Sequence, residues 1–371
     1  MIYLDYAASS PPFPQVIDEM GAVAAAHFGN PGALHKYGAD ARGILQKSRL
    51  LLAQSTNVRP EEIFFTSGGT EANNWAVAAG CAAGGRKHIV CNSAEHSSVL
   101  AAVAQMAQKG YDVTYLNPDR EGRILPEAVV AVLRPDTALV CVQAVNNETG
   151  VIQDVDAIAA AARQGGARYF CDGVQSFGHV AQNLYKADLI SLSAHKLGGP
   201  RGVGCLIARQ PLSPAPLIVG GGQEFGLRSG TENLPGIAGF AAAAILSTEK
   251  LSQEQPRLAA LTALLEAELR RLCPEVRIAG EGAARSSILC CALPGISGEE
   301  MAVGLDLKEI CVSPGAACAA RSARPSHVLL SMGYSPKEAA EFIRLSPGRY
   351  TTEAEIYHTA AVISDMLRKR S

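Results

Sequence analysis

The sequence lacks long apolar runs, an excess of charge of either sign and a leader-like amino terminus. No apolar run approaches the roughly 18 residues of a membrane-crossing helix, so we expect no membrane association. The 33 Lys and Arg residues stand against 35 Asp and Glu residues, and the net charge of −2 argues against a nucleic-acid-binding face. The chain does not begin with a basic segment followed by an apolar one, so we expect no signal peptide and a cytoplasmic protein.

The sequence also lacks the spacing motifs of common metal and nucleotide sites. The cysteines number 10, and none forms a C-x-x-C pair, so we expect no zinc or thioredoxin-type site and assign no metal ligands. Reduced thiols are the simplest interpretation. Five cysteines lie in apolar runs typical of core strands: Cys141, Cys171, Cys205, Cys290 and Cys291. G-x-x-x-x-G-K-[ST] does not occur, so a nucleotide P-loop is not expected.

Short apolar runs alternate with alanine-rich helical stretches between about residues 60 and 210. The predicted strands are 63–65, 88–91, 113–116, 138–142, 167–171 and 189–192, and the predicted helices between them are 70–82, 97–109, 126–133 and 155–164. Near-continuous apolar strands separated by helices predict an α/β fold with a mainly parallel sheet covered on both faces. In such sheets, ligands bind at the carboxyl ends of the strands.

A smaller α+β domain is predicted after a helix over about 233–250. The segment 253–256 contains Pro256 and is interpreted as a domain junction. The elements predicted beyond it are a core-facing leucine stripe at 258, 261, 265 and 269, a strand over 287–291 and helices over 298–307 and 352–368. We therefore expect a large domain over 13–255 and a small domain made of 1–12 and 256–371.

Lys196 follows a short apolar run in the sequence Ser193-Ala194-His195-Lys196. The run over 187–192 is typical of a buried strand, and such strands rarely carry Lys. A buried amine loses its charge readily and becomes a nucleophile, as a Schiff base with an aldehyde cofactor requires. From the tetrapeptide alone, a surface lysine in a turn is an equally good interpretation.

A candidate phosphate loop, Thr66-Ser67-Gly68-Gly69-Thr70-Glu71, follows one predicted strand and begins a helix. Small residues such as Gly69 let backbone N–H groups at a helix N-terminus approach a phosphate, and the Thr70 hydroxyl can add a hydrogen bond. An ordinary helix cap by Ser67 or Thr70 would give the same pattern.

Three further strand ends carry polar side chains. Asp172 could pair with a protonated ring nitrogen, although Asp at this position also caps helices. His96 could stack on a cofactor ring or move protons, although a lone His is more often structural. Asn147 lies in a segment with turn chemistry and adds an amide at the same edge. With Lys196 and the loop at Thr70, these residues make up the set that pyridoxal phosphate needs.

The ordered motifs resemble the cysteine desulfurases of the NifS/IscS type, in the class-V aminotransferase group of fold-type I enzymes. The similar segments span nearly the whole chain and are Tyr3–Ala8, Asn30-Pro31 with His35 and Gly38, Phe65–Asn74, Asn146–Glu148 with Gly150-Val151, Asp172 with Gln175-Ser176, Ser193–Lys196, Gly220–Glu224, Arg228–Thr231, Gly315–Cys318 and Ile343–Ser346. The resemblance implies a mainly parallel seven-stranded sheet between helices, a smaller α+β domain, pyridoxal 5′-phosphate as cofactor and L-cysteine as substrate.

The resemblance also implies residue roles. Lys196 would hold the cofactor covalently, His96 would stack on its ring and move protons, and Cys318 would attack the substrate sulfur and keep it as a persulfide, leaving alanine. Asp172 would hold the ring nitrogen, Gln175 and Asn147 would contact the phenolic oxygen or the substrate, and Gly69, Thr70, Ser193 and His195 would hold the phosphate. Arg344 would bind the substrate carboxylate. Thr231 would reach the cofactor phosphate of the other subunit, which implies a homodimer.

The chain departs from the family pattern at a few positions. Phe225 replaces an Arg that is usual there, and Pro314 and the segment 318–322 differ from the usual serine-rich cysteine loop. The chain stops soon after its last predicted helix, without the tail that helps longer members dock an iron–sulfur scaffold. The resemblance implies an iron–sulfur scaffold or a sulfurtransferase as the sulfur acceptor, and the missing tail argues against the scaffold.

Other functions remain open at this stage. A selenocysteine lyase or cyst(e)ine lyase would use the same scaffold without needing Cys318. A class-V transaminase would have no use for Cys318. A non-catalytic partner protein with this fold would not need Lys196, His96 and Asp172 together.

Overall fold

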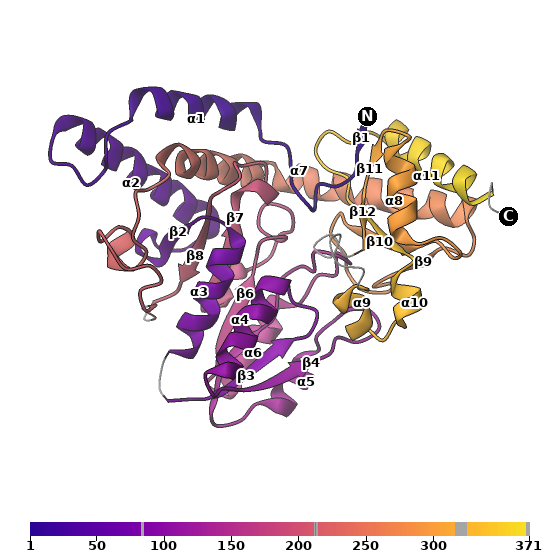
Figure 1. The fold of residues 1–371 in the computed structure, drawn as a ribbon, viewed down its shortest axis with the longest axis horizontal. Coiled ribbons are helices and arrows are strands. Elements are labelled where there is room, and N and C mark those ends of the chain that lie inside the picture. Colours follow the sequence, from indigo (N-terminus) through magenta and orange to yellow (C-terminus); the bar gives the residue numbers. More distant parts are fainter. Residues whose placement is uncertain (83–84, 211, 213, 316–324, 369–371) are drawn as a thin grey trace.

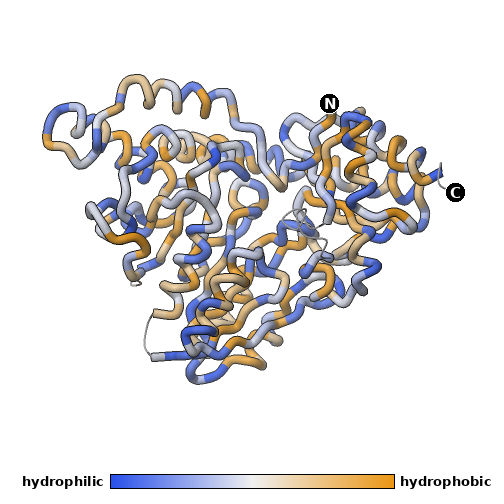
Figure 2. Tube along the Cα trace, in the orientation of Figure 1, coloured by the Kyte–Doolittle hydropathy of each residue, from blue (hydrophilic) through white to orange (hydrophobic). Residues whose placement is uncertain are grey.

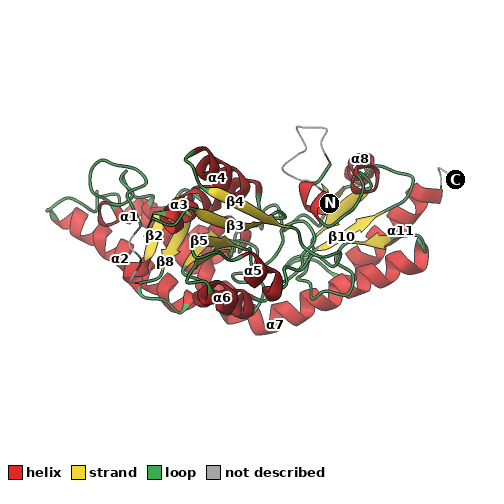
Figure 3. Cartoon of the chain, turned by 90° about the horizontal axis from the view of Figure 1, so that it is seen from below, coloured by secondary structure: helices red, strands yellow, loops and turns green. Residues whose placement is uncertain are grey.

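Helix α7 (Leu234–Leu272) runs along the molecule and connects a larger sheet-and-helix part with a smaller one (Figures 1 and 3). The computed structural model describes residues 1–371 except 83–84, 211, 213, 316–324 and 369–371. Cys318 therefore lies outside the described residues. None of the helices in the described part of the chain has both the length and the apolar content that a membrane crossing requires.

The larger part is built on a seven-stranded sheet in the order β2-β8-β7-β6-β5-β3-β4. Its strands are β2 (Ile63–Thr66), β3 (His88–Asn92), β4 (Asp112–Leu116), β5 (Thr137–Cys141), β6 (Arg168–Asp172), β7 (Leu189–Ser193) and β8 (Gly204–Ala208). β8 runs antiparallel to β2 and β7, and the other neighbours pair in parallel. The predicted α/β fold with a mainly parallel seven-stranded sheet is confirmed.

Helices cover both faces of this sheet (Figure 3). One face packs against α3 (Gly69–Cys81) and α4 (Ser97–Gln108). The other packs against α1 (Pro14–Ala26), α2 (Lys36–Thr56), α5 (Pro126–Val132), α6 (Val155–Gln164) and the first half of α7. The double cover explains why the central strands are mainly apolar (Figure 2) and why Cys141, Cys171 and Cys205 in this sheet are buried as predicted. Cys290 and Cys291 are buried as well, in the smaller part.

The smaller part contains a four-stranded antiparallel sheet in the order β12-β13-β10-β9. Its strands are β9 (Arg277–Ile278), β10 (Leu289–Ala292), β12 (Ser313–Pro314) and β13 (Phe342–Leu345). The amino-terminal β1 (Ile2–Tyr3) pairs in parallel with β11 (Ile310–Cys311). The helices here are α8 (Gly298–Asp306), α9 (His327–Ser331), α10 (Pro336–Ala339) and α11 (Glu353–Arg368).

Helix α7 corrects one expectation. The sequence predicts a helix that ends near residue 250 and a break at 253–256, but α7 continues through Pro256 to Leu272. An internal Pro costs a helix ~3 kcal/mol because it removes one hydrogen bond and crowds the preceding turn. Burial on both sides offsets this cost, since Ala244 packs in the large core and the predicted leucine stripe from Leu258 to Leu269 packs in the small one. We retain the boundary at 255/256 as a proposal, now within a helix.

Candidate active site

Loops from five strands meet at one edge of the large sheet. β3, β5, β6 and β7 are parallel, and β2 shares their direction because β2 and β7 both run antiparallel to β8. Thr66 and Ser193, at the ends of β2 and β7, both pair with Gly204. A Cβ at Gly204 would lie 2.5 Å from the Leu192 carbonyl oxygen and 2.8 Å from Gly68 Cα, so this approach requires glycine.

A cavity of about 340 Å³ lies at this edge, between the sheet and the smaller part. It brings together ten of the predicted residues: Gly69, Thr70, His96, Asn147, Asp172, Gln175, Ser193, His195, Lys196 and Arg344. Thr231 is exposed and lines a separate hollow with Gly202 and Arg228. The structure thus gathers the predicted cofactor and substrate residues of one chain, and it leaves Thr231 outside the group.

The cavity continues into a second hollow at the N-terminus of α3, lined by Ser67, Gly68, Gly69, Thr70, Glu71, Ser193, His195 and Arg201 among others. Gly68 caps α3 at a φ of 155°, and a Cβ at Gly69 would lie 3.0 Å from Val174 Cγ2. Burial, with help from Lys196 and Arg201, lowers the pKa of His195 to about 4, so this imidazole is neutral at pH 7. Backbone N–H groups, a neutral His and a nearby Arg form a site suited to a phosphate.

Lys196 is half-buried, and its amine contacts the amino-terminal segment. Its Nζ donates to the carbonyl oxygens of Ala7 at 2.7 Å and Ala8 at 2.9 Å. Its own carbonyl accepts from Ser10 Oγ at 2.6 Å and His179 Nε2 at 3.0 Å. Lys196 therefore lines the cavity, and hydrogen bonds hold its main chain in place. The alternative interpretation, a surface lysine in a turn, does not describe this residue.

A hydrogen-bonded chain links Asp172 to His96. Asp172 is 6% exposed, and its Oδ2 accepts from Asn73 Nδ2 at 2.8 Å. Asn73 Nδ2 also lies 2.9 Å from Ser98 Oγ, which lies 2.7 Å from His96 Nδ1. Sequence reasoning missed Asn73 and Ser98. The available signal was an amide at a buried position of a helix, next to Ala72, where an apolar side chain would be expected.

His96 and Glu95 are both neutral near pH 7. His96 caps α4, and its Nδ1 accepts from the Ser98 backbone N–H at 3.2 Å, which places the proton of the neutral ring on Nε2. Burial lowers the pKa of His96. Burial, and secondly the charge of Asp172, raise the pKa of Glu95 to about 8. Asp172 acts on both groups, since it adds to the rise in the Glu95 pKa and opposes the lowering of the His96 pKa.

We expect Glu95→Gln to flatten the pH dependence of folding stability. The ordinary pKa of Glu95 is 4.5 and its folded value is about 8, so the folded state binds the proton more tightly. The resulting stabilisation is full below about pH 4.5 and is lost as the pH rises through about 8. Between about pH 6 and pH 9, wild type should lose more thermal stability than the variant.

The control for this measurement is Glu127→Gln, which changes an exposed Glu on α5. The two variants and wild type are compared by thermal melting across the pH series. A Glu95→Gln curve that runs parallel to those of wild type and Glu127→Gln would show that Glu95 carries its charge in the folded state at neutral pH.

Arg344 joins the amino-terminal segment to the sheet edge. Its side chain is 2% exposed, and its Nη2 lies 2.8 Å from Asp5 Oδ1 while its Nη1 donates to the Asn147 carbonyl at 2.8 Å. Arg344 Nε and Asn147 Oδ1 are buried and have no hydrogen-bond partner among the described residues. Asp5 was part of a recognised motif but had no predicted role. Its pairing with Arg344, 339 residues away, could not be read from local sequence.

The comparisons with known proteins agree with this geometry. The aminotransferase class-V family model matches residues 2–358. Cysteine desulfurase IscS of Dictyoglomus turgidum is 35% identical over 373 residues, which is 99% of this chain and 95% of the relative. Cysteine desulfurase IscS of Shewanella baltica is 38% identical over 378 residues, covering 99% and 93%.

Solved structures extend the likeness to three dimensions. A NifS-like protein superposes with a TM-score of 0.91 at 32% identity and covers 99% of both chains. A NifS-like protein from Rickettsia africae gives 0.88 at 28% identity, covering 100% of this chain and 99% of its own. The chain therefore belongs to the aminotransferase class-V family, among the cysteine desulfurases of the NifS/IscS type.

Proposed function

We propose that this chain is a pyridoxal-phosphate-dependent cysteine desulfurase, which takes sulfur from L-cysteine, leaves L-alanine and carries the sulfur as a persulfide on Cys318. The observation that carries the proposal is the single cavity in which Lys196, Asp172 and Arg344 meet. An amine, a buried acid and a guanidinium serve a cofactor aldehyde, a cofactor ring nitrogen and a substrate carboxylate respectively. The names of the full-length relatives support the same reaction.

The residues present fit this cofactor. When bound, pyridoxal phosphate supplies an aldehyde that captures amines and a ring that withdraws electrons. Gly69, Thr70, Ser193 and His195 would hold the phosphate at the N-terminus of α3, and Lys196 would hold the aldehyde carbon. The Asp172 carboxylate, held by Asn73, would pair with the ring nitrogen.

Arg344 would orient the substrate. The Arg344 Nε has no partner among the described residues, and an α-carboxylate would supply one. The Asn147 Oδ1 also has no partner among the described residues, but as an acceptor it needs a donor and not a carboxylate. Asp5 neutralises part of the guanidinium charge and fixes its plane, so the carboxylate meets a preset donor.

The sulfur step would use a thiolate from this chain. The Cys318 thiolate attacks the sulfur of bound L-cysteine, an S–S bond forms, and the substrate C–S bond breaks. The carbon takes a proton and alanine leaves, while the extra sulfur remains on Cys318. A neutral imidazole with its proton on Nε2, as His96 has here, can deliver or receive a proton at this point. An iron–sulfur scaffold or a sulfurtransferase would then accept the sulfur.

The test is incubation of the purified, cofactor-loaded protein with L-cysteine. We expect alanine to form and the peptide that contains Cys318 to gain the mass of one sulfur atom. Free sulfide formed at full rate without any mass gain on this peptide would favour a lyase, as would selenide formed in a parallel incubation with L-selenocysteine. Transfer of the amino group to a keto acid would favour a transaminase, and a protein without cofactor absorbance would favour a non-catalytic role.

We further propose a homodimer with shared active sites. Thr231 is exposed and lies outside the Lys196 cavity of its own chain. The loop that carries it is held by a buried ion pair, in which Arg49 Nη2 lies 2.6 Å from Glu224 Oε1. Phe225 and Val219 on this loop are exposed, at 62% and 84%. A rigid loop with exposed apolar side chains suits an interface with a second copy.

Mixing two inactive variants, Lys196→Ala and Thr231→Asp, should restore activity. Each variant alone lacks a complete site, because one loses the amine and the other places a negative charge against the phosphate. After subunit exchange, a heterodimer would hold one undamaged site made of Lys196 from one chain and Thr231 from the other. Alanine formation after mixing should reach a measurable fraction of wild type. Demonstrated exchange without recovery would show that Thr231 serves its own subunit.

A further inference from the structure

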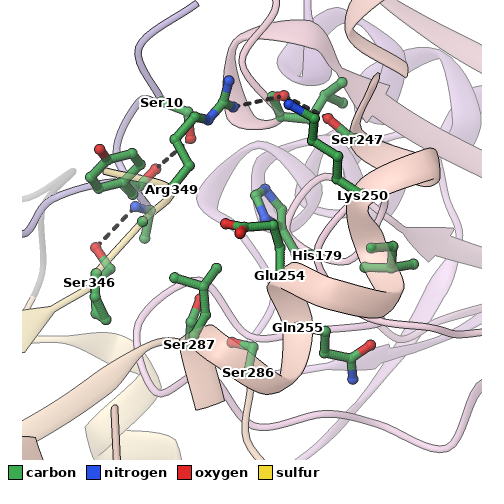
Figure 4. A pocket seen from close by; sticks show the side chains of 18 of the residues that line it. Ser10, His179, Ser247, Lys250, Glu254, Gln255, Ser286, Ser287, Ser346 and Arg349 are labelled. Carbon is green, nitrogen blue, oxygen red and sulfur yellow. Dashed lines mark hydrogen bonds between the residues drawn. The ribbon is translucent and has the colours of Figure 1, made fainter. Parts of the chain in front are cut away.

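A second cavity of about 340 Å³ adjoins the main chain of Lys196, because Ser10 and His179, which donate to the Lys196 carbonyl, line it (Figure 4). Its walls come from the amino-terminal residues, the loop after β6, helix α7 and the segments 286–288 and 346–350. Figure 4 shows Arg349 and Lys250 on one side of the pocket and Ser286 and Ser287 on the other. Gln175 lines both this cavity and the one that contains Lys196, but neither the cofactor nor the substrate of the proposed reaction uses Arg349, Lys250, Ser286 or Ser287.

The cavity has an apolar body and a positive end. Its apolar lining includes Phe13, Pro14, Leu251, Leu258, Ile288 and Pro347. Two cations lie over the Phe13 ring, with Arg349 Cζ at 3.3 Å and Lys250 Nζ at 5.3 Å from the centroid. The one lining carboxylate among the described residues, Glu254, acts on Arg349 but is also bound by Arg257 at 2.8 Å, so a single shared carboxylate faces two cations in the cavity.

Two buried polar atoms in the lining lack partners. Arg349 Nη1 and Ser286 Oγ make no hydrogen bond to any described residue. Burial also lowers the pKa of Arg349, which means that its surroundings do not fully support the charge. An unpaired buried donor is costly, and an anion would supply the missing acceptor.

We propose that this cavity is a second ligand site, for a small organic anion with an apolar body. The anionic group would lie between Arg349 and Lys250, and the apolar body would pack on Leu251, Leu258 and Ile288. Concave sites of this size, mainly apolar with a few convergent polar groups, are typical small-molecule sites.

The walls of this cavity also hold the main chain of Lys196. Ser10 Oγ and His179 Nε2 donate to the Lys196 carbonyl, and Ser247 Oγ and Arg349 Nη2 donate to the Leu197 carbonyl at 2.8 and 3.2 Å. A ligand that draws Arg349 or His179 toward itself would shift this main chain. Binding of a ligand in this cavity should therefore change the rate of turnover, which depends on Lys196. This expectation rests on the proposed function.

Calorimetric titration of the cofactor-loaded protein with 4-phenylbutyrate tests the site. We expect one molecule per subunit to bind. The neutral analogue 4-phenyl-1-butanol should bind roughly tenfold more weakly or worse, since it lacks the charge-assisted bonds, and 4-phenylbutylamine should not bind. Ser287→Phe fills the cavity and should abolish binding. Lys250→Gln should weaken binding, whereas Lys47→Gln, the same change at an exposed position on α2, should not.

Binding of 4-phenylbutyrate to Arg344 in the other cavity would be unaffected by Ser287→Phe, so undiminished binding by that variant would overturn the proposal. Equal affinity for the acid and the alcohol would also overturn it. If Ser287→Phe fails to fold, as judged by its melting curve, Lys250→Gln against Lys47→Gln decides alone. Saturating 4-phenylbutyrate should change alanine formation in wild type and not in Ser287→Phe, and binding without that change would overturn the coupling to Lys196.

Discussion

Replacing Lys196 with Ala should remove both bound cofactor and turnover. Lys196 is the only lysine among the described residues that line the cavity with Asp172 and His96, so no second amine there can hold an aldehyde. Its main chain is braced by Ser10 and His179, which fixes where the amine can reach. A covalent anchor and a proton carrier are lost together, and rates should fall to the uncatalysed level.

Visible absorbance of the purified variant, borohydride trapping and alanine formation from L-cysteine measure this result. Lys308→Ala is the control, since it removes an exposed lysine of the smaller part. It should keep the absorbance and rate of wild type. Lys196→Ala protein that still contains borohydride-trappable cofactor and still forms alanine would assign both roles to another residue.

Six of the seven strands of the large sheet and the edge that carries the site follow from patterns that are local in sequence, whereas the strand order and strand β8 were not predicted. Each apolar run between helices became a strand of the large sheet, because a strand buried on both faces needs apolar side chains throughout. The polar residues after those runs met at one edge because the strands are parallel. His96, Asp172 and Lys196 were therefore predictable as a group.

The features that escaped prediction depend on contacts between distant segments. The break expected at Pro256 is absent because two separate cores bury α7 on either side of it. Asp5 binds Arg344, which is 339 residues away, and Asn73 binds Asp172, which is 99 residues away. The residues next to Asp5 and Asn73 in the sequence do not indicate these partners. The role of Asn73 was easier to predict from the sequence than that of Asp5, because an amide at a buried helical position indicates a polar partner.

The other thiols of this chain are poorly suited to carry sulfur. Eight of the nine described cysteines are buried, and Cys311 is partly exposed. Burial raises the pKa of Cys141 and Cys290 well above the ordinary value, and it raises the pKa of Cys311 as well. A thiol held protonated is a weak nucleophile, and a buried one cannot reach either substrate or acceptor. Cys318 lies in a run of glycine and alanine, outside any predicted core strand.

Changing Cys318 to Ser should therefore stop sulfur release and leave cofactor binding intact. The serine hydroxyl is close in size but is not a thiolate at neutral pH, so the attack on the substrate sulfur fails while Lys196, Asp172 and Arg344 are untouched. Addition of L-cysteine should still change the cofactor spectrum, but neither alanine nor persulfide should accumulate. Cys311→Ser, which alters the one partly exposed cysteine among those described, should behave as wild type. Wild-type rates of alanine formation by Cys318→Ser would assign the chain to the lyases, whose chemistry does not require this thiol.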